Sequence, residues 1–250
     1  MGQLFNKDEV FDTDYAYFYE VALLEQNVVE AKLIESLLDL PLDSYILDSP
    51  CGNGRITNLL ASFGYNLYGV DSNKEYLTDA KIEAEQENLK VKYYQSDIRT
   101  FKAPIQFDAI INWHNSFGYF DDLENRELLK GFYDNLQVGG KLLIEQVNRD
   151  RILKLLLPGG ALWTDAVFRD NNMMIDRVRY TVETGRMDVV RISLKDGKLI
   201  DKLYSFRIFT FPELKDWLLS VGFRNIQVFG EDGEPFNLDS KRMIVIAEKR

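Results

Sequence analysis

The first 150 residues alternate between short apolar runs and longer segments in which apolar residues recur every three or four positions. Short apolar runs predict buried strands, and the three-to-four spacing predicts helices that bury one face. The predicted strands are 45–49, 67–71, 91–95, 107–112 and 141–147. The predicted helices are 13–39, 55–63, 74–88 and 123–136. Strands that alternate with helices in this way form a parallel sheet with helices on both faces.

The pattern changes after Pro158-Gly159-Gly160, which interrupts the helical and strand spacing. Residues 161–209 hold several β-like segments and no good helical pattern. Within them, Thr184-Gly185 and Asp196-Gly197 are typical hairpin turns, so we expect an antiparallel sheet of three or four strands. A helix at 212–220 and strands at 223–229 and 242–248 complete the pattern.

Together these elements predict an α/β fold, a doubly wound, Rossmann-like, mostly parallel sheet of seven strands with a small antiparallel β insertion. Residues 1–160 and 210–250 should form the sheet domain, and residues 161–209 the inserted subdomain. Because the insertion follows the fifth strand, we expect it over the carboxyl ends of the sheet, where such folds bind ligands.

Composition narrows the class of protein. The chain has 250 residues, of which 46% are apolar, but no run approaches the roughly 20 residues that cross a bilayer, so we expect no membrane association. The polar N-terminus shows no secretory signal pattern, and a single cysteine fits a reducing compartment, so we expect a cytoplasmic protein. One cysteine and one histidine argue against a metal site. A net charge of −10 disfavours nucleic acid and tolerates a cationic substrate.

The segment from Ile46 to Arg55, with Asp71 after it, points to a ligand. A strand enters a turn through Gly52 and Gly54, and helical spacing starts at once. Turn glycines let the backbone approach a ligand, and a carboxylate that ends the second strand can accept hydrogen bonds from ribose hydroxyls. This arrangement is typical of a site for an adenosine-containing cofactor.

A dinucleotide-binding fold is the obvious rival interpretation. Its fingerprint requires a third glycine, but Thr57 stands at that position. Instead, Asp48 lies four residues before the first glycine, and the spacing Asp48-x-x-x-Gly52-x-Gly54 resembles the first motif of the class I S-adenosylmethionine-dependent methyltransferases.

Nearly the whole chain resembles a small-molecule branch of that family. The resemblance is carried by the blocks 47–55, 68–72, 107–120 and 139–144, and by the tail 209–223. Within these, the phrase Ser116-Phe117-Gly118-Tyr119-Phe120 is more specific than the glycine turn. In this branch an inserted antiparallel sheet covers the acceptor site, and sugar-amine and amino-acid N-methyltransferases are built similarly. The resemblance therefore implies methyl transfer to a small molecule, with an amine nitrogen as the expected acceptor.

The resemblance implies S-adenosyl-L-methionine as the cofactor and a set of residues around it. The expected cofactor-binding residues are Tyr19, Asp48, Gly52, Gly54, Arg55, Asp71, Ser72, Asp97, Ile98, Asn112 and Trp113. Among them, Asp48 should orient the turn and the cofactor's amino group, and Asp97 should accept from the adenine amino group. Each aspartate also has a simpler interpretation as a residue that caps a turn.

On the acceptor side, His114 is the candidate catalytic residue, because it follows the fourth strand and can hold a proton near neutral pH. Tyr15 and Tyr119 are the candidate substrate-binding residues. A lone histidine is more often structural, and helix tyrosines often only contact the sheet, so both interpretations stay open. Cys51 is expected to be a small packing residue of the turn.

The sequence thus predicts a small-molecule methyltransferase, and a homodimer is possible. Two other classes stay open at this point. One is a non-catalytic cofactor-binding protein of the same fold, because site residues can persist without turnover. The other is a dinucleotide-dependent oxidoreductase, against which Thr57 speaks.

Overall fold

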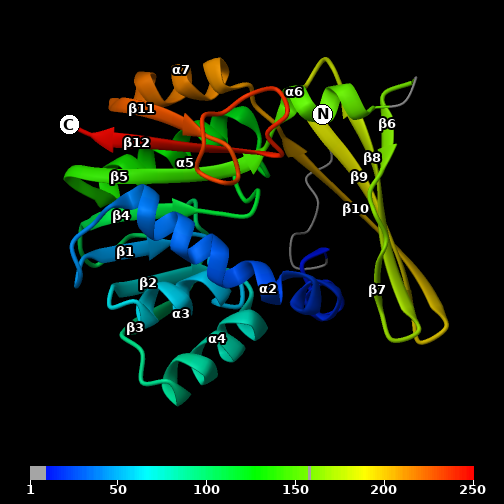
Figure 1. The fold of residues 1–250 in the computed structure, drawn as a ribbon, viewed down its shortest axis with the longest axis horizontal. Helices are drawn as coiled ribbons and strands as arrows, with labels where there is room; N and C mark the ends of the chain where they lie inside the picture. The colour runs from blue at the N-terminus through cyan, green and yellow to red at the C-terminus, as the bar shows by residue number, and fades with distance from the viewer. Residues whose placement is uncertain (1–9, 157–158) are drawn as a thin grey trace.

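A seven-stranded sheet forms the centre of the computed structural model, which describes residues 10–156 and 159–250. The strand order is β11-β12-β5-β4-β1-β2-β3 (Figure 1). The strands are β1 (Tyr45–Asp48), β2 (Asn66–Asp71), β3 (Val91–Gln95), β4 (Phe107–Asn112), β5 (Leu136–Val147), β11 (Phe223–Phe229) and β12 (Arg242–Lys249). Only β12 runs against its neighbours in this sheet, pairing antiparallel with both β5 and β11. The predicted fold class is confirmed.

Helices cover both faces of this sheet. They are α2 (Thr13–Leu38), α3 (Arg55–Ser62), α4 (Lys74–Gln86), α5 (Asp122–Asn135) and α7 (Phe211–Val221), while α6 (Arg149–Leu155) packs against the insertion. Side chains of α2 and α3, such as Ile34 and Leu60, form one buried apolar cluster with the sheet. Side chains of α5 and α7, such as Phe132 and Trp217, form the other. The two clusters hold the sheet rigid, so the ends of its strands are fixed points for a site.

The predicted antiparallel insertion is a second sheet with the order β10-β9-β8-β6, and β7 pairs with β8. Its strands are β6 (Ala161–Trp163), β7 (Val167–Arg169), β8 (Asn172–Thr181), β9 (Arg186–Lys195) and β10 (Lys198–Arg207). Figure 1 shows this sheet beyond the carboxyl ends of the parallel strands. Both hairpins turn where the Thr184-Gly185 and Asp196-Gly197 signals predict them.

Three features differ from the sequence expectations. The inserted sheet has five strands rather than three or four. Strand β5 begins at Leu136 rather than at 141, and Gly139-Gly140 form a register irregularity against β4 rather than a turn before the strand. Helix α6 was not predicted, because its seven residues are too few for a helical repeat of apolar positions to show, although Ile152 and Leu153 pack partly buried against apolar side chains of the insertion. The side chain of Asn148 begins α6 by accepting hydrogen bonds from two backbone N–H groups.

Within the described residues, no helix combines the length and the apolar character that crossing a membrane requires.

Gly54 is needed for packing as well as for its backbone conformation. Its φ is +81°, and a Cβ there would lie 2.5 Å from the Tyr93 hydroxyl and 2.7 Å from the Ala80 Cβ. Tyr93 cannot simply swing away, because its hydroxyl donates to Asn58 Oδ1 at 2.6 Å. The missing side chain of Gly54 thus brings α4 and β3 against the turn after β1.

We expect Gly54→Ala to destabilise the chain more than Gly139→Ala, which is its matched control. Both glycines have φ of +81°, but nothing lies within 4 Å of a Cβ at Gly139. The free energy of unfolding of the control should therefore fall by about 1–2 kcal/mol, which is the cost of placing alanine in the left-handed conformation. In Gly54→Ala the free energy of unfolding should fall by about 1–3 kcal/mol more, because the added methyl group overpacks the contact with Tyr93 and Ala80. Urea unfolding of both variants measures the difference, and equal losses would contradict the packing role of Gly54.

Candidate functional site

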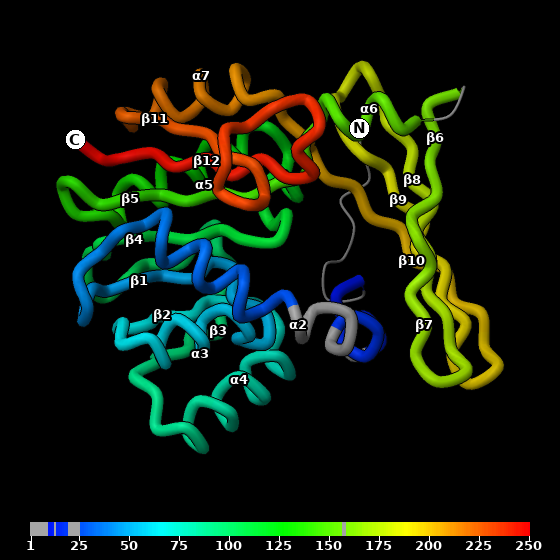
Figure 2. The backbone as a smooth tube through the Cα atoms, in the orientation of Figure 1, coloured from blue at the N-terminus to red at the C-terminus, as the bar shows by residue number. Residues whose placement is uncertain are grey.

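A cavity of about 850 Å³ opens at the carboxyl ends of β1 and β2. Its walls come from the turn after β1, the start of α4, the loop after β4, and α2. Figure 2 shows the beginning of α2 lying between the central sheet and the insertion. Of the residues predicted from the sequence, those that line the cavity are Tyr15, Tyr19, Asp48, Gly52, Arg55, Asp71, Ser72, Asp97, Ile98, Trp113, His114 and Tyr119.

The glycine turn is tied to the end of β2. Gly52 has φ of +55°, and no atom lies within 4 Å of the place where its Cβ would be. Its N–H donates to Asp71 Oδ2 at 2.9 Å, while Asp71 Oδ1 accepts from the N–H of Asn73 at 2.9 Å. The carboxylate of Asp71 thereby connects the turn to the start of α4. The backbone of the turn is left open on the side of the cavity.

Asp48 is a buried carboxylate that borders the cavity from the end of β1. Thr57 donates its hydroxyl to Asp48 Oδ2 at 2.6 Å and is, within the described residues, its one hydrogen-bonding partner. Burial raises the pKa of Asp48 to about 7, although the Thr57 hydrogen bond and the charge of Arg55 act in the opposite direction. Thr57 stands at the position of the third glycine of the dinucleotide fingerprint, and here its hydroxyl holds the buried Asp48 carboxyl in place.

Asp97 and Ile98 form another part of the wall, after β3. Asp97 Oδ1 accepts from the backbone N–H of Arg99 at 2.9 Å and from its Nε at 3.0 Å. The same guanidinium reaches Glu124, and Arg99 also lies 4.4 Å from the centre of the Phe120 ring. These contacts hold this edge of the cavity between β3 and α5.

Arg55 and Trp113 both contact α2. Arg55 Nη1 lies 2.6 Å from Glu30 Oε2 and donates to Asn27 Oδ1 at 2.9 Å. Trp113 Nε1 donates to the same Glu30 oxygen at 3.0 Å. Glu30 and Asn27 were missed from the sequence, because their partners lie 25 to 83 positions further along the chain. Their effect is to fix α2 over the glycine turn.

Two residues expected at the cofactor do not line the cavity. Gly54 faces Tyr93 and Ala80, as described above. Asn112 is fully buried, and its amide donates to the carbonyl of Ser49 at 2.7 Å, which ties the end of β4 to the turn after β1.

Tyrosines and His114 gather at the end of the cavity nearest the insertion. The rings of Tyr15 and Tyr19 lie 4.5 Å apart, and the ring of Tyr19 lies 6.4 Å from that of His114. Burial raises the pKa of each tyrosine hydroxyl there, including that of Tyr119, so all three hydroxyls stay protonated. We call this part of the wall, made of Tyr15, Tyr19, Tyr119 and His114, the tyrosine end.

His114 is neutral and has an unsatisfied ring nitrogen. Its Nδ1 is buried and has no hydrogen-bond partner within the described residues. Burial, with smaller contributions from Arg55 and Arg242, lowers the pKa of His114 well below its ordinary value of 6.5. Its backbone φ is +57°, a left-handed conformation that non-glycine residues rarely adopt. A neutral imidazole in this position can accept or donate one hydrogen bond, but it is a weak base.

A buried ion pair of the insertion lies behind the tyrosine end. Arg191 binds Asp176 through two hydrogen bonds of 2.9 and 2.8 Å, and Tyr204 donates its hydroxyl to Asp176 at 2.9 Å. The guanidinium lies 4.8 Å from the centre of the Tyr15 ring. This pair was not predicted, yet the alternation in β8 and β9 places both residues at inward-facing positions. Strict attention to that alternation could have found it.

The start of α2 connects the sheet domain to the insertion. The side chain of Asn73 donates to the carbonyl of Phe11 at 2.9 Å, and the hydroxyl of Tyr76 donates to the carbonyl of Asp12 at 2.9 Å. From the other side, Lys202 of β10 forms an ion pair with the Asp12 side chain. This segment was not singled out from the sequence, because its partners are more than 60 residues away. It closes the cavity between α4 and the insertion.

Comparison with known proteins agrees with the geometry. Residues 46–140 match a family model described as a methyltransferase domain. A putative methyltransferase from a Geobacillus species is 23% identical over 94% of this chain and 98% of its own length. A glycine/sarcosine N-methyltransferase from Aphanothece halophytica is 26% identical over 82% of this chain and 76% of its length. A ubiquinone biosynthesis O-methyltransferase from Coxiella burnetii is 30% identical, but the chain spans only 52% of its length.

Solved structures share the fold. An S-adenosylmethionine-dependent methyltransferase from Clostridium acetobutylicum superposes with a TM-score of 0.78, at 17% identity, over 98% of this chain and 99% of its own. The sugar N-methyltransferase KedS8 from a Streptoalloteichus species superposes with a TM-score of 0.69, at 18% identity, over 94% of this chain and 92% of its own. Both include the inserted sheet in the superposed length, since the match covers nearly the whole chain.

The raised pKa of Asp48 predicts a stability that falls with pH. The pKa is about 7 in the folded chain against 3.8 for an ordinary aspartate, so between these values the folded chain holds a proton that the unfolded chain has released. The contribution of Asp48 to the free energy of unfolding is therefore full below about pH 4 and is lost as the pH rises to about 7. We expect Asp48→Asn to flatten this decline. Urea unfolding at several pH values measures it, and equal slopes in both proteins would rule out Asp48 as the source.

Proposed function

We propose that this chain, which belongs to the class I S-adenosylmethionine-dependent methyltransferases, transfers the methyl group to an amine nitrogen of a small molecule. The observation that carries the proposal is one cavity with two unlike ends. One end has the backbone and carboxylates that suit the cofactor, and the other is the tyrosine end, which suits a neutral polar acceptor.

The cofactor end fits S-adenosylmethionine in shape and charge. Gly52 leaves the backbone open to a ligand, and Asp71 presents a carboxylate at the end of β2 for the ribose hydroxyls. Asp48 is suited to the ammonium group of the methionine part, since a cation beside it favours the ionised carboxylate. When bound, the cofactor supplies an electron-poor methyl group on sulfonium. The residues of the chain need only hold acceptor and methyl group in line.

The tyrosine end favours an amine over a hydroxyl as the acceptor group. A neutral amine already carries the lone pair that attacks, and it gives up its proton after transfer. An alcohol must lose its proton during the attack and needs a stronger base than a histidine whose pKa lies well below 6.5. His114 and the hydroxyls of Tyr15 and Tyr19 can orient an N–H group by hydrogen bonds. Two of the similar proteins are N-methyltransferases of a sugar and of glycine or sarcosine, which supports this choice.

The proposal is tested in two steps. Calorimetry with S-adenosylhomocysteine and with NAD separates a methyltransferase from a dinucleotide-dependent enzyme, and we expect heat only from the first. Turnover of labelled S-adenosylmethionine is then followed against paired small molecules that differ only in an amine or a hydroxyl group. Methylated amines identified by mass spectrometry support the proposal. Methylation of the hydroxyl partners alone would overturn the amine acceptor, and cofactor binding without any turnover would favour a non-catalytic protein.

Asp71→Asn should weaken binding of S-adenosylhomocysteine. The amide keeps the shape of the side chain but removes its charge and one of the two oxygens that accept from Gly52 and Asn73. Each hydrogen bond to a charged group is worth about 1.5–3 kcal/mol, so the ribose and the turn that faces it are both held less firmly. Calorimetry should therefore show a Kd at least about tenfold higher. Asp201→Asn, on an exposed position of β10, is the matched control and should bind normally. Unchanged affinity in folded Asp71→Asn would mean that the ribose is held elsewhere.

His114→Asn should lower kcat while the affinity for S-adenosylhomocysteine stays the same. Asparagine tolerates the left-handed backbone of this position, so the fold is kept. We expect a fall of about tenfold to a hundredfold, the loss of one orienting group. Because burial keeps the pKa of His114 well below 6.5, the wild-type rate should show no step near that pH. A step near pH 6.5 that vanishes in the variant would show instead that His114 titrates during turnover.

A further inference from the structure

The loop that follows β4 is held by its backbone carbonyls. Within residues 117–120, four successive carbonyls accept hydrogen bonds from groups on other elements. Two of the donors belong to the sheet domain. Gln146 of β5 donates its amide to the carbonyl of Phe117 at 2.6 Å, and Asn125 of α5 donates to that of Phe120 at 2.8 Å. A loop held at each residue moves as one piece.

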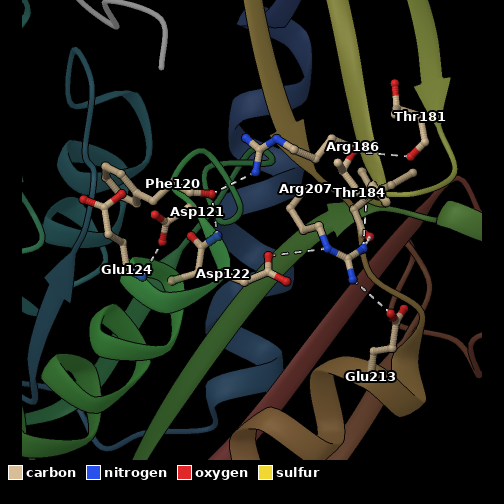
Figure 3. A network of polar contacts seen from close by, with 12 residues as sticks. Phe120, Asp121, Asp122, Glu124, Thr181, Thr184, Arg186, Arg207 and Glu213 are labelled. Atoms are coloured by element: carbon tan, nitrogen blue, oxygen red, sulfur yellow. Dashed lines mark hydrogen bonds and ion pairs between the residues drawn. The ribbon is translucent and has the colours of Figure 1, made fainter. Parts of the chain in front are cut away.

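The insertion supplies the other donors. The backbone N–H of Arg207 donates to the carbonyl of Gly118 at 2.8 Å. The guanidinium of Arg186 reaches two neighbouring carbonyls, that of Tyr119 at 3.2 Å through Nη2 and that of Phe120 at 2.9 Å through Nη1. Figure 3 shows Arg186 extending from the insertion to the carbonyl of Phe120. Hydrogen bonds therefore connect the loop to the central sheet and to the inserted sheet at the same time.

Arg186 is anchored on its own side as well. Its Nε donates to Ser205 Oγ at 2.9 Å, and its Nη2 donates to the Ser205 carbonyl at 3.0 Å. None of its hydrogen bonds within the described residues goes to a carboxylate. A planar guanidinium whose hydrogen bonds all go to neutral oxygens fixes the geometry of the groups that it joins. Its neighbour Arg207 differs, since it forms an ion pair with Glu213 at 3.0 Å.

The two residues that Arg186 holds face different parts of the cavity wall. The ring of Phe120 lies under the guanidinium of Arg99, which also binds Asp97 at the expected adenine edge. The ring of Tyr119 belongs to the tyrosine end and lies 6.1 Å from the Phe206 ring of the insertion. One guanidinium thus fixes the backbone at the point where the cofactor end and the acceptor end of the cavity meet.

We propose that Arg186 is a positioning residue that transmits occupancy of the cofactor end, through the Tyr119 and Phe120 carbonyls, to the insertion. The inference rests on the proposed cofactor site. Binding of the cofactor then stiffens the sheet that covers the acceptor before any acceptor arrives. The consequence is a coupling free energy between the two ends of one cavity.

Hydrogen–deuterium exchange of the full chain tests this without knowledge of the acceptor. The probe is S-adenosylhomocysteine at saturation. We expect slower exchange in peptides that cover 97–99 and 117–120, and also in peptides of the insertion around 182–190 and 203–208. The slowing in the insertion should be at least about fivefold, the lower end of the usual coupling between sites.

Arg186→Lys is the decisive variant. Lysine keeps the charge but cannot reach both carbonyls and Ser205 at once. We expect the slowing to remain at 97–99 and to disappear from the insertion, while the Kd for S-adenosylhomocysteine stays within about twofold of the wild-type value. Arg179→Gln removes an exposed arginine of β8 and is the matched control, which should behave as the wild type does. A melting curve without ligand checks that each variant is folded.

Ser205→Ala provides a milder second variant, because it removes the side-chain anchor of Arg186 and leaves the guanidinium in place. It should reduce the slowing in the insertion without abolishing it. Slowing in the insertion that is unchanged in folded Arg186→Lys would overturn the proposal, and so would a wild-type chain in which the probe binds but leaves the insertion unaffected. Absence of any binding heat and of slowing anywhere would overturn the proposed function itself, and this inference with it.

Discussion

The reversal of strand order between β1 and β4 is the constraint on which the site depends. Strand β1 pairs with β2 on one side and with β4 on the other, so the connections that leave their carboxyl ends diverge and open a crevice. The chain ends β1 with Asp48 and β2 with Asp71 at this crevice. Because both strands are buried in the sheet, the backbone positions of Asp48 and Asp71 are fixed. The insertion then needs only to stand over the crevice to turn it into a cavity.

Much of the fold was predictable because it depends on local sequence patterns, that is, on residues close together in the chain. Strand runs and hairpin turns depend on a few adjacent side chains, and the structure has them where the sequence predicts them. The start of β5 was wrong because a glycine pair signals a turn and a bulge equally well. Most of the residues expected at the cofactor do line the cavity, since the ends of parallel strands meet at one edge. What they contact there stays a prediction.

The rest of the site could not be predicted, because it is made by contacts between distant segments. Glu30 joins Arg55 to Trp113, and Arg186 joins the insertion to a loop 66 residues earlier in the chain. No local pattern distinguishes such a glutamate or arginine from one on the surface. The role of Thr57 is intermediate, because its departure from the dinucleotide fingerprint was visible, while its hydrogen bond to Asp48 required the structure.

Burial at the tyrosine end has a consequence for whatever molecule enters it. The desolvation that raises the pKa of Tyr15 and lowers that of His114 opposes any charged form in that place. The ion pair of Arg191 with Asp176 is internally balanced and offers a guest no net charge as compensation. A protonated amine drawn from solution by a chain with net charge −10 would thus meet, at the last step, surroundings that favour release of its proton. For the proposed amine acceptor, the acidic surface would attract the cationic form and the buried tyrosine end would favour the neutral, nucleophilic form, without a base dedicated to that task.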